Sequence, residues 1–109
     1  MNKFRLKSNI MGNIIVQFSI KKMNQAQYDK VIAHLEAAGF GNVPGRLYHV
    51  AAPNGEGWHV TDVWESEETF KNFADTMVPI LASTGVEPAE PLILPVHHII
   101  RSENVNVPN

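Results

Sequence analysis

The stretch that decides the fold is residues 46–65, which read RLYHVAAPNGEGWHVTDVWE. Two runs of β-branched and aromatic residues, 46–52 and 57–65, flank the polar letters PNGE. Asn54-Gly55 within that segment is the strongest short hairpin signal, because a type I′ turn needs positive φ at both central residues. The stretch therefore predicts two antiparallel strands joined by a tight turn.

The turn also sets which residues pair across the hairpin and which face each side chain takes. With Asn54-Gly55 at its centre, His49 lies opposite Val60. We expect the face with His49 to be turned away from the helices, and Tyr48 to pack under a helix on the other face. A hairpin bulge would exchange the two faces. The face with His49 would carry Leu47, His49, Ala51, Trp58, Val60, Asp62 and Trp64.

Outside the hairpin, the pattern predicts two further strands and two helices. Residues 14–20 are β-branched and apolar and predict a buried strand, and residues 92–101 predict the last strand. Helices are predicted over 24–38 and from Ser66 to near Gly85. The resulting order is β-α-β-β-α-β. It predicts an α+β, ferredoxin-like fold, with an antiparallel four-stranded sheet and both helices on one face.

Both predicted helices carry an apolar stripe at helical spacing. In the first helix, Asn24 is the N-cap and Tyr28 opens a stripe that continues to Leu35. In the second helix, Ser66 is the cap and Pro79 predicts a kink or a restart. The stripes indicate the helix faces that cover the sheet, so Tyr28 is assigned to packing.

The sheet face that the helices leave open would be apolar in this register. It would hold Ala51, Trp58, Val60 and Trp64, which are too apolar to remain in water. Two copies that bury these faces against each other would form an isologous homodimer, and the fold would become a dimeric α+β barrel.

Length and composition limit the class of protein. The chain has 109 residues, no cysteine and a net charge of −2. We expect one domain over 13–101, between a mobile N-terminal extension at 1–12 and a C-terminal tail at 102–109, with Met11 as a candidate start. The absence of cysteine excludes disulfides, thiolate nucleophiles and cysteine-bound metals.

Charge and hydropathy also limit the partners and the compartment. The acidic balance argues against nucleic acid, and no apolar run is long enough to span a membrane. We therefore expect a cytoplasmic protein. A second copy is the expected partner on the apolar sheet face, and a small aromatic ligand is expected because Trp58 and Trp64 could stack on it.

Two motifs resemble those of a known family. Asp62-Val63-Trp64-Glu65-Ser66, followed by Phe70, is a strand that ends in tryptophan and leads into a capped helix, and Pro95-Val96-His97 lies in the last strand. With the order of elements over 13–101, they resemble the antibiotic biosynthesis monooxygenase-like family, and the second motif is similar to a bacterial subgroup without assigned activity.

The resemblance implies a small dimeric α+β barrel. It also implies an activity like that of cofactor-independent oxygenases acting on polycyclic phenols and hydroquinones. A haem-degrading branch of the family uses an axial histidine on the second helix. Residues 66–85 contain no histidine, so the resemblance does not extend to haem degradation.

The candidate catalytic residues are His49, Asp62 and His97. In the predicted register, His49 and Asp62 lie diagonally on adjacent strands, where side chains interact. A carboxylate that orients an imidazole makes a general base, and His97 would join them if it shares their face. The same groups could instead form a buried hydrogen bond that only satisfies polar atoms. They also match a metal-binding facial triad by composition. We nevertheless predict no metal and no cofactor.

The candidate substrate-binding residues are Trp58 and Trp64, which could stack on an aromatic compound or simply fill the core. Arg46 and Arg101 stand near strand ends, where each could hold an anionic substrate or be solvated.

Two functions from different classes fit these residues. The first is a cofactor-independent monooxygenase. His49 or His97 would deprotonate a phenol in the barrel cavity, Asp62 would orient the base, and dioxygen would react directly with the anion. The second is a non-catalytic dimeric barrel that binds a small ligand or has a structural role. The sequence leaves open whether the protein is an enzyme.

Overall fold

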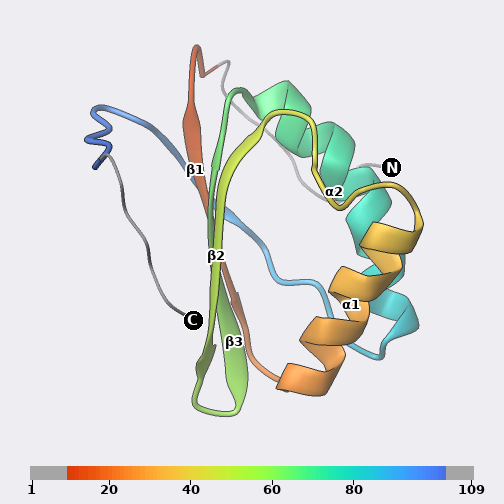
Figure 1. The fold of residues 1–109 in the computed structure, drawn as a ribbon. Coiled ribbons are helices and arrows are strands. Elements are labelled where there is room, and N and C mark those ends of the chain that lie inside the picture. The colour runs from red at the N-terminus through yellow and green to blue at the C-terminus, as the bar shows by residue number, and fades with distance from the viewer. Residues whose placement is uncertain (1–9, 103–109) are drawn as a thin grey trace.

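The computed structural model describes residues 10–102 (Figure 1). Most of the predicted extension at 1–12 and of the tail at 102–109 lies outside the described residues. The elements are β1 (Ile14–Ile20), α1 (Gln25–Ala37), β2 (Arg46–Asn54), β3 (Gly57–Trp64), α2 (Glu67–Ser83) and β4 (Leu92–Pro95). They follow the predicted order.

The strands form an antiparallel sheet in the order β2-β3-β1-β4. Both helices cover the same face of this sheet (Figure 1). The predicted ferredoxin-like α+β fold is therefore confirmed.

The core lies between the sheet and the helices, because alternate residues of β1 all point to that side. In β1 these buried residues are Ile14, Val16, Phe18 and Ile20. Helix α1 contributes Val31 and Leu35, and helix α2 contributes Phe70, Phe73, Ala74 and Leu81.

Each helix begins at the residue that the sequence predicts as its cap. Asn24 and Gln27 form a capping box at the start of α1, and the Ser66 hydroxyl accepts a hydrogen bond from the Thr69 backbone N–H at the start of α2. Helix α2 continues through Pro79 to Ser83, so the restart predicted at the proline does not occur.

The hairpin has a different register from the predicted one. His49 pairs with Asp62 rather than with Val60, and Asn54 pairs with Gly57, so Gly55-Glu56 forms the turn. Gly55 supplies the positive φ, at 59°. The register is displaced by two residues. Because two is the side-chain period of a strand, this displacement by itself moves no residue to the other face.

The prediction of which face the helices cover is wrong. Trp58, Val60 and Asp62 are buried beneath the helices, and Tyr48 lies on the open face with 45% of its surface exposed. The physical reason lies in β1, which is fully apolar on only one face. The residues of that apolar face pair with Trp58, Val60, Asp62 and Trp64 of β3. Helices dock where both strands are apolar.

The last strand is shorter than predicted. It ends at Pro95, because proline has no N–H to continue the ladder, although the Val96 backbone N–H still donates to the carbonyl of Asn13. Residues 97 and 98 are consequently exposed and outside the sheet.

Candidate functional site

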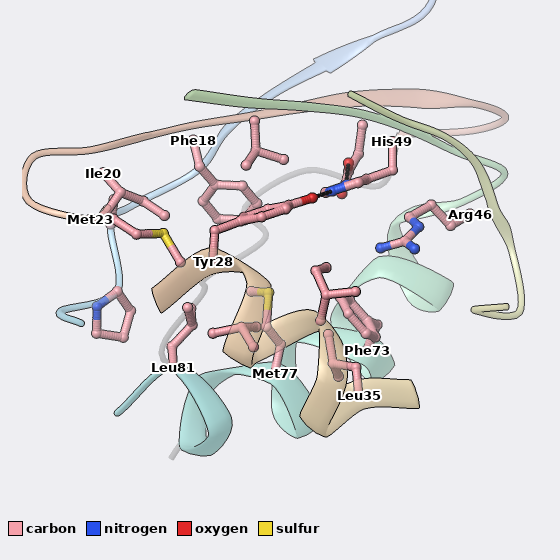
Figure 2. Close-up of a pocket in the computed structure, with 16 residues that line it drawn as sticks. Phe18, Ile20, Met23, Tyr28, Leu35, Arg46, His49, Phe73, Met77 and Leu81 are labelled. Atoms are coloured by element: carbon pink, nitrogen blue, oxygen red, sulfur yellow. Dashed lines mark hydrogen bonds and ion pairs between the residues drawn. The ribbon is translucent and has the colours of Figure 1, made fainter. Parts of the chain in front are cut away.

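A largely apolar cavity lies between the helix-covered face of the sheet and the two helices (Figure 2). The volume of the cavity is about 50 Å³. Of the described residues that line it, only four have polar side-chain groups that can form hydrogen bonds: Tyr28, Arg46, His49 and Asp62.

A continuous chain of hydrogen bonds runs along one wall of this cavity. The Tyr28 hydroxyl lies 2.6 Å from His49 Nε2, and His49 Nδ1 lies 2.6 Å from Asp62 Oδ1. Trp64 Nε1 donates to Asp62 Oδ2 at 3.2 Å. The carboxylate only accepts, so a neutral His49 carries its proton on Nδ1 and accepts from Tyr28 at Nε2. The chain thus presents a tyrosine hydroxyl backed by an oriented imidazole.

Local structure explains how these side chains meet. The pairing of β2 with β3 places His49 directly opposite Asp62 on the helix-covered face. The first turn of α1 brings Tyr28 over them, and its ring stacks on Trp58 with centroids 5.1 Å apart. The helix and the hairpin therefore each supply part of the site, and neither is sufficient alone.

Burial changes the acidity of the tyrosine in this chain. Loss of solvent raises the pKa of the Tyr28 hydroxyl above the ordinary 10.0, and the nearby charge of Asp62 acts in the same direction. The positive charge of Arg46 partly opposes this rise. The hydroxyl is thus held in its neutral form, in which it can donate to His49.

Arg46 enters the cavity through a β-bulge. The pairing of β2 with β3 shifts between Arg46 and Tyr48, so Arg46 lies opposite Trp64 while Leu47 has no partner. Without the extra residue, strict alternation would put Arg46 on the open face with Tyr48. In Figure 2 its guanidinium points into the cavity, and it lies 5.6 Å from the centroid of the Phe73 ring.

The structure brings two of the three predicted catalytic residues together. His49 and Asp62 are in direct contact, whereas His97 is exposed beyond the end of β4 and does not line the cavity. The prediction that His97 joins them is wrong, because Pro95 ends the strand that would have carried it inward.

The two predicted substrate-binding residues do not line the cavity. Trp64 is fully buried against Phe70 and Phe73, and its indole N–H donates a hydrogen bond to Asp62. The ring of Trp58 stacks on the ring of Tyr28. Each tryptophan therefore contacts a side chain that lines the cavity but does not line the cavity itself. Sequence reasoning missed Tyr28, whose place in an apolar helix stripe was the available signal.

A wide groove adjoins the cavity on the side of the segment that links α2 to β4. Ile20, Pro88 and Ala89 line both the groove and the cavity, and Lys21, Lys22, Glu87 and Glu90 line the groove alone. The cavity and the groove therefore share a boundary at these three residues.

Two features are absent from the part of the chain that the structure describes. Within residues 10–102, no group of three or more histidine, aspartate or glutamate side chains could hold a metal ion. No helix there is long and apolar enough to cross a membrane.

Comparison with known proteins gives matches only among solved structures. No family model and no curated protein matches the chain. A candidate antibiotic biosynthesis monooxygenase from Deinococcus radiodurans superposes with a TM-score of 0.58, 11% identity and coverage of 84% of this chain and 99% of that one. One from Caulobacter crescentus gives a TM-score of 0.55, 20% identity, and 79% and 89% coverage. One from Bordetella bronchiseptica gives 0.54, 15% identity, and 83% and 100% coverage.

The structure and these matches define a small ferredoxin-like α+β protein with a cavity between its sheet and helices. More particularly, its fold is that of the antibiotic biosynthesis monooxygenase-like proteins, as the sequence resemblance implied.

Proposed function

We propose that the protein is a cytoplasmic homodimer that binds a small phenolic compound in the cavity and removes a proton from its hydroxyl group, which prepares it for monooxygenation by dioxygen. The observation that carries this proposal is the chain of Tyr28, His49 and Asp62 at the wall of an otherwise apolar cavity. The fold shared with monooxygenase-like structures supports it further.

The proton moves through Tyr28 to His49. The substrate hydroxyl donates its proton to the Tyr28 oxygen while the Tyr28 proton passes to Nε2 of His49, 2.6 Å away. The products are a phenolate and an imidazolium, and Asp62 stabilises the imidazolium through its bond to Nδ1. Tyr28 itself ends the step neutral, in agreement with its raised pKa.

The phenolate then supplies all the electrons for the reaction with dioxygen. One oxygen atom replaces a ring hydrogen ortho or para to the hydroxyl and becomes a carbonyl oxygen, and the other leaves as water. A phenol and dioxygen thus give a quinone and water, with atoms and electrons balanced and no further reductant. The protein's residues bind the phenol, remove its proton and keep water out.

The cavity suits a small ring compound if its walls adjust. Its open space of about 50 Å³ is less than the roughly 150 Å³ of an apolar cavity that binds benzene. Met23 and Met77 line it, and unbranched methionine side chains move readily to admit a ligand. We therefore expect compounds of one or two rings.

A second copy of the chain is the proposed partner, on the open face of the sheet. Across the four strands this face carries Leu94, Ile15, Val63 and Tyr48 in one row. Tyr48 and Leu94 are exposed there. A homodimer through this face would remove their apolar surface from water.

The alternative function is a barrel that binds a small ligand without reaction or has a structural role. The same observation that supports catalysis favours it, since the polar atoms of His49 and Asp62 already have partners, and a satisfied buried network stabilises a core. The two functions differ in turnover and not in the fold.

Oxygen uptake with a panel of phenol, 1-naphthol and 2-naphthol tests the proposal. His49→Ala should lower the rate with the best substrate by about 100-fold or more, the usual contribution of a general base. His34→Ala is the matched control, because His34 is exposed on α1. An unchanged rate in His49→Ala refutes the mechanism. A wild type that binds these compounds without oxygen uptake supports the alternative.

Sedimentation velocity tests the proposed partner. Val50→Lys places a charge on the open face, where Val50 is 62% exposed, and should convert a dimer into a monomer. Ala33→Lys on the exposed side of α1 is the control. A monomeric wild type, or a dimer that survives Val50→Lys, contradicts this interface.

A further inference from the structure

We infer that the compound bound in the cavity is an aromatic acid, and that Arg46 is the residue that selects it by binding its carboxylate. The inference rests on the proposed function in one respect, namely that the cavity is the binding site. It adds the charge of the ligand and the residue that recognises it.

The first observation is the placement of Arg46 by the bulge. One extra residue in β2, Leu47, rotates Arg46 from the open face to the helix-covered face, where it lines the cavity. Bulges often re-aim a side chain next to a functional site. A strand that followed strict alternation would leave the arginine in solvent, at no cost to the core.

The second observation is that Arg46 has no ion-pair partner within the part of the chain that the structure describes. Among residues 10–102 no carboxylate lies within ion-pair distance of its guanidinium. Among residues 10–102, Asp62 is the one carboxylate that lines the cavity, and its two oxygens already accept from His49 and Trp64. Arg46 is partly buried, and an anion that pairs with a partly desolvated guanidinium offsets the cost of its burial, so an anionic ligand would be bound preferentially.

The third observation is the arrangement of polar groups around the apolar walls. Because of the bulge, Arg46 and His49 lie opposite Trp64 and Asp62, which are two residues apart on β3, or about 7 Å along the strand. In Figure 2 the Tyr28 hydroxyl meets His49 at the sheet wall of the cavity, and the Arg46 guanidinium points into the same cavity. A ring with a hydroxyl at one end and a carboxylate at the other suits this spacing, because arginine binds a carboxylate with two parallel hydrogen bonds.

Arg101, the other arginine considered from the sequence, does not compete for this role. It lies over the Tyr48 ring, at 5.7 Å from the centroid, and Tyr48 belongs to the open face of the sheet. The structure therefore separates two arginines that the sequence left equivalent, and it makes Arg101 a matched control.

Isothermal titration calorimetry under nitrogen tests the inference with two pairs of probes. Each pair compares an acid with its neutral amide: 4-hydroxybenzoate with 4-hydroxybenzamide, and 6-hydroxy-2-naphthoate with its amide. The wild type should bind the acid of at least one pair about tenfold more tightly than the amide, as a charge-assisted pair provides. Arg46→Met should abolish this preference and leave the amide affinity within about twofold. Arg101→Met should keep it.

Three results overturn the inference: no preference for the acid in the wild type, binding of none of the four probes, or a preference that survives in Arg46→Met. Arg46→Gln serves as a second variant if thermal denaturation shows that Arg46→Met is unfolded. The outcome is independent of turnover. If the acid binds through Arg46 but oxygen uptake is absent, the proposed reaction fails and the inference stands. If His49→Ala loses turnover while the wild type shows no preference for the acid, the proposed reaction stands and the inference about Arg46 fails.

Discussion

Replacing Asp62 by asparagine keeps the shape of the side chain and removes its charge. Asp62 accepts from His49 Nδ1 at 2.6 Å and from Trp64 Nε1 at 3.2 Å, and it is 3% exposed. Asparagine has one acceptor oxygen, which Trp64 can use, and an amide that donates. His49 must then accept at Nδ1 and carry its proton on Nε2. The direction of the bond to Tyr28 reverses, and the general base is lost.

Asp62→Asn and Asp62→Ala should differ in how much they lower the free energy of unfolding. Asp62→Ala leaves the buried Trp64 N–H and the partly buried His49 N–H without an acceptor, at about 1–3 kcal/mol each, or about 2–6 kcal/mol together. Asp62→Asn replaces two bonds to a carboxylate with two neutral ones, which costs about 1–2 kcal/mol. At about 4 °C per kcal/mol for a domain of this size, Asp62→Ala should lower Tm by roughly 8–24 °C and Asp62→Asn by roughly 4–8 °C.

Three measurements check this reasoning. Thermal denaturation gives the order of stability, with Asp75→Asn on the exposed side of α2 as the control. The ¹⁵N shifts of the His49 ring report the proton on Nδ1 in the wild type and on Nε2 in Asp62→Asn. Oxygen uptake should fall in Asp62→Asn as far as in His49→Ala. Unchanged ring shifts, or full activity in Asp62→Asn, would refute the directed chain of hydrogen bonds.

Two further predictions concern Tyr28 and the hairpin. The absorbance of Tyr48→Phe at 295 nm, where Tyr28 is the one tyrosine left, should titrate with a midpoint above 10.0; a midpoint at or below 10.0 contradicts its burial. Because the pKa of Tyr28 is raised in the folded protein, the stability that the neutral side chain contributes is present below pH 10 and is lost as the pH rises through the folded pKa. Urea denaturation between pH 8 and 11 will measure this loss of stability. Gly57→Ala should cost about 3 kcal/mol or more, since its Cβ would lie 2.0 Å from the carbonyl oxygen of Ile20. Gly41→Ala, whose Cβ has only ordinary contacts, is the control, and equal urea midpoints would contradict the close approach of the strands.

The fold could be predicted because each helix and each strand of the hairpin carries its own local sequence signal. Caps at Asn24 and Ser66 mark where the helices begin, and the alternating runs mark the hairpin. The sequence predicts the turn one residue too early, because Asn54-Gly55 is the stronger local turn signal, whereas in the structure Asn54 pairs with Gly57 and the turn is Gly55-Glu56. The pair of His49 and Asp62 still shared a face, since a displacement of two residues preserves it.

The site could be predicted only in part, because its remaining residues come from other elements. Tyr28 reads as one more apolar position in a helix stripe, and only the docking of α1 places its hydroxyl on His49. Arg46 reads as a solvated strand end, and only the bulge turns it inward. His97 reads as part of a long last strand, which Pro95 ends too early.

The sequence by itself determined the order of the elements, their caps and the grouping of His49 with Asp62, because each depends on residues close in the chain or on the period of a strand. The tertiary structure decided which sheet face the helices cover. Alternation defines two faces of a hairpin, and only packing against β1 and the helices distinguishes them. The same packing made the cavity and gave Tyr28 and Arg46 their places in it.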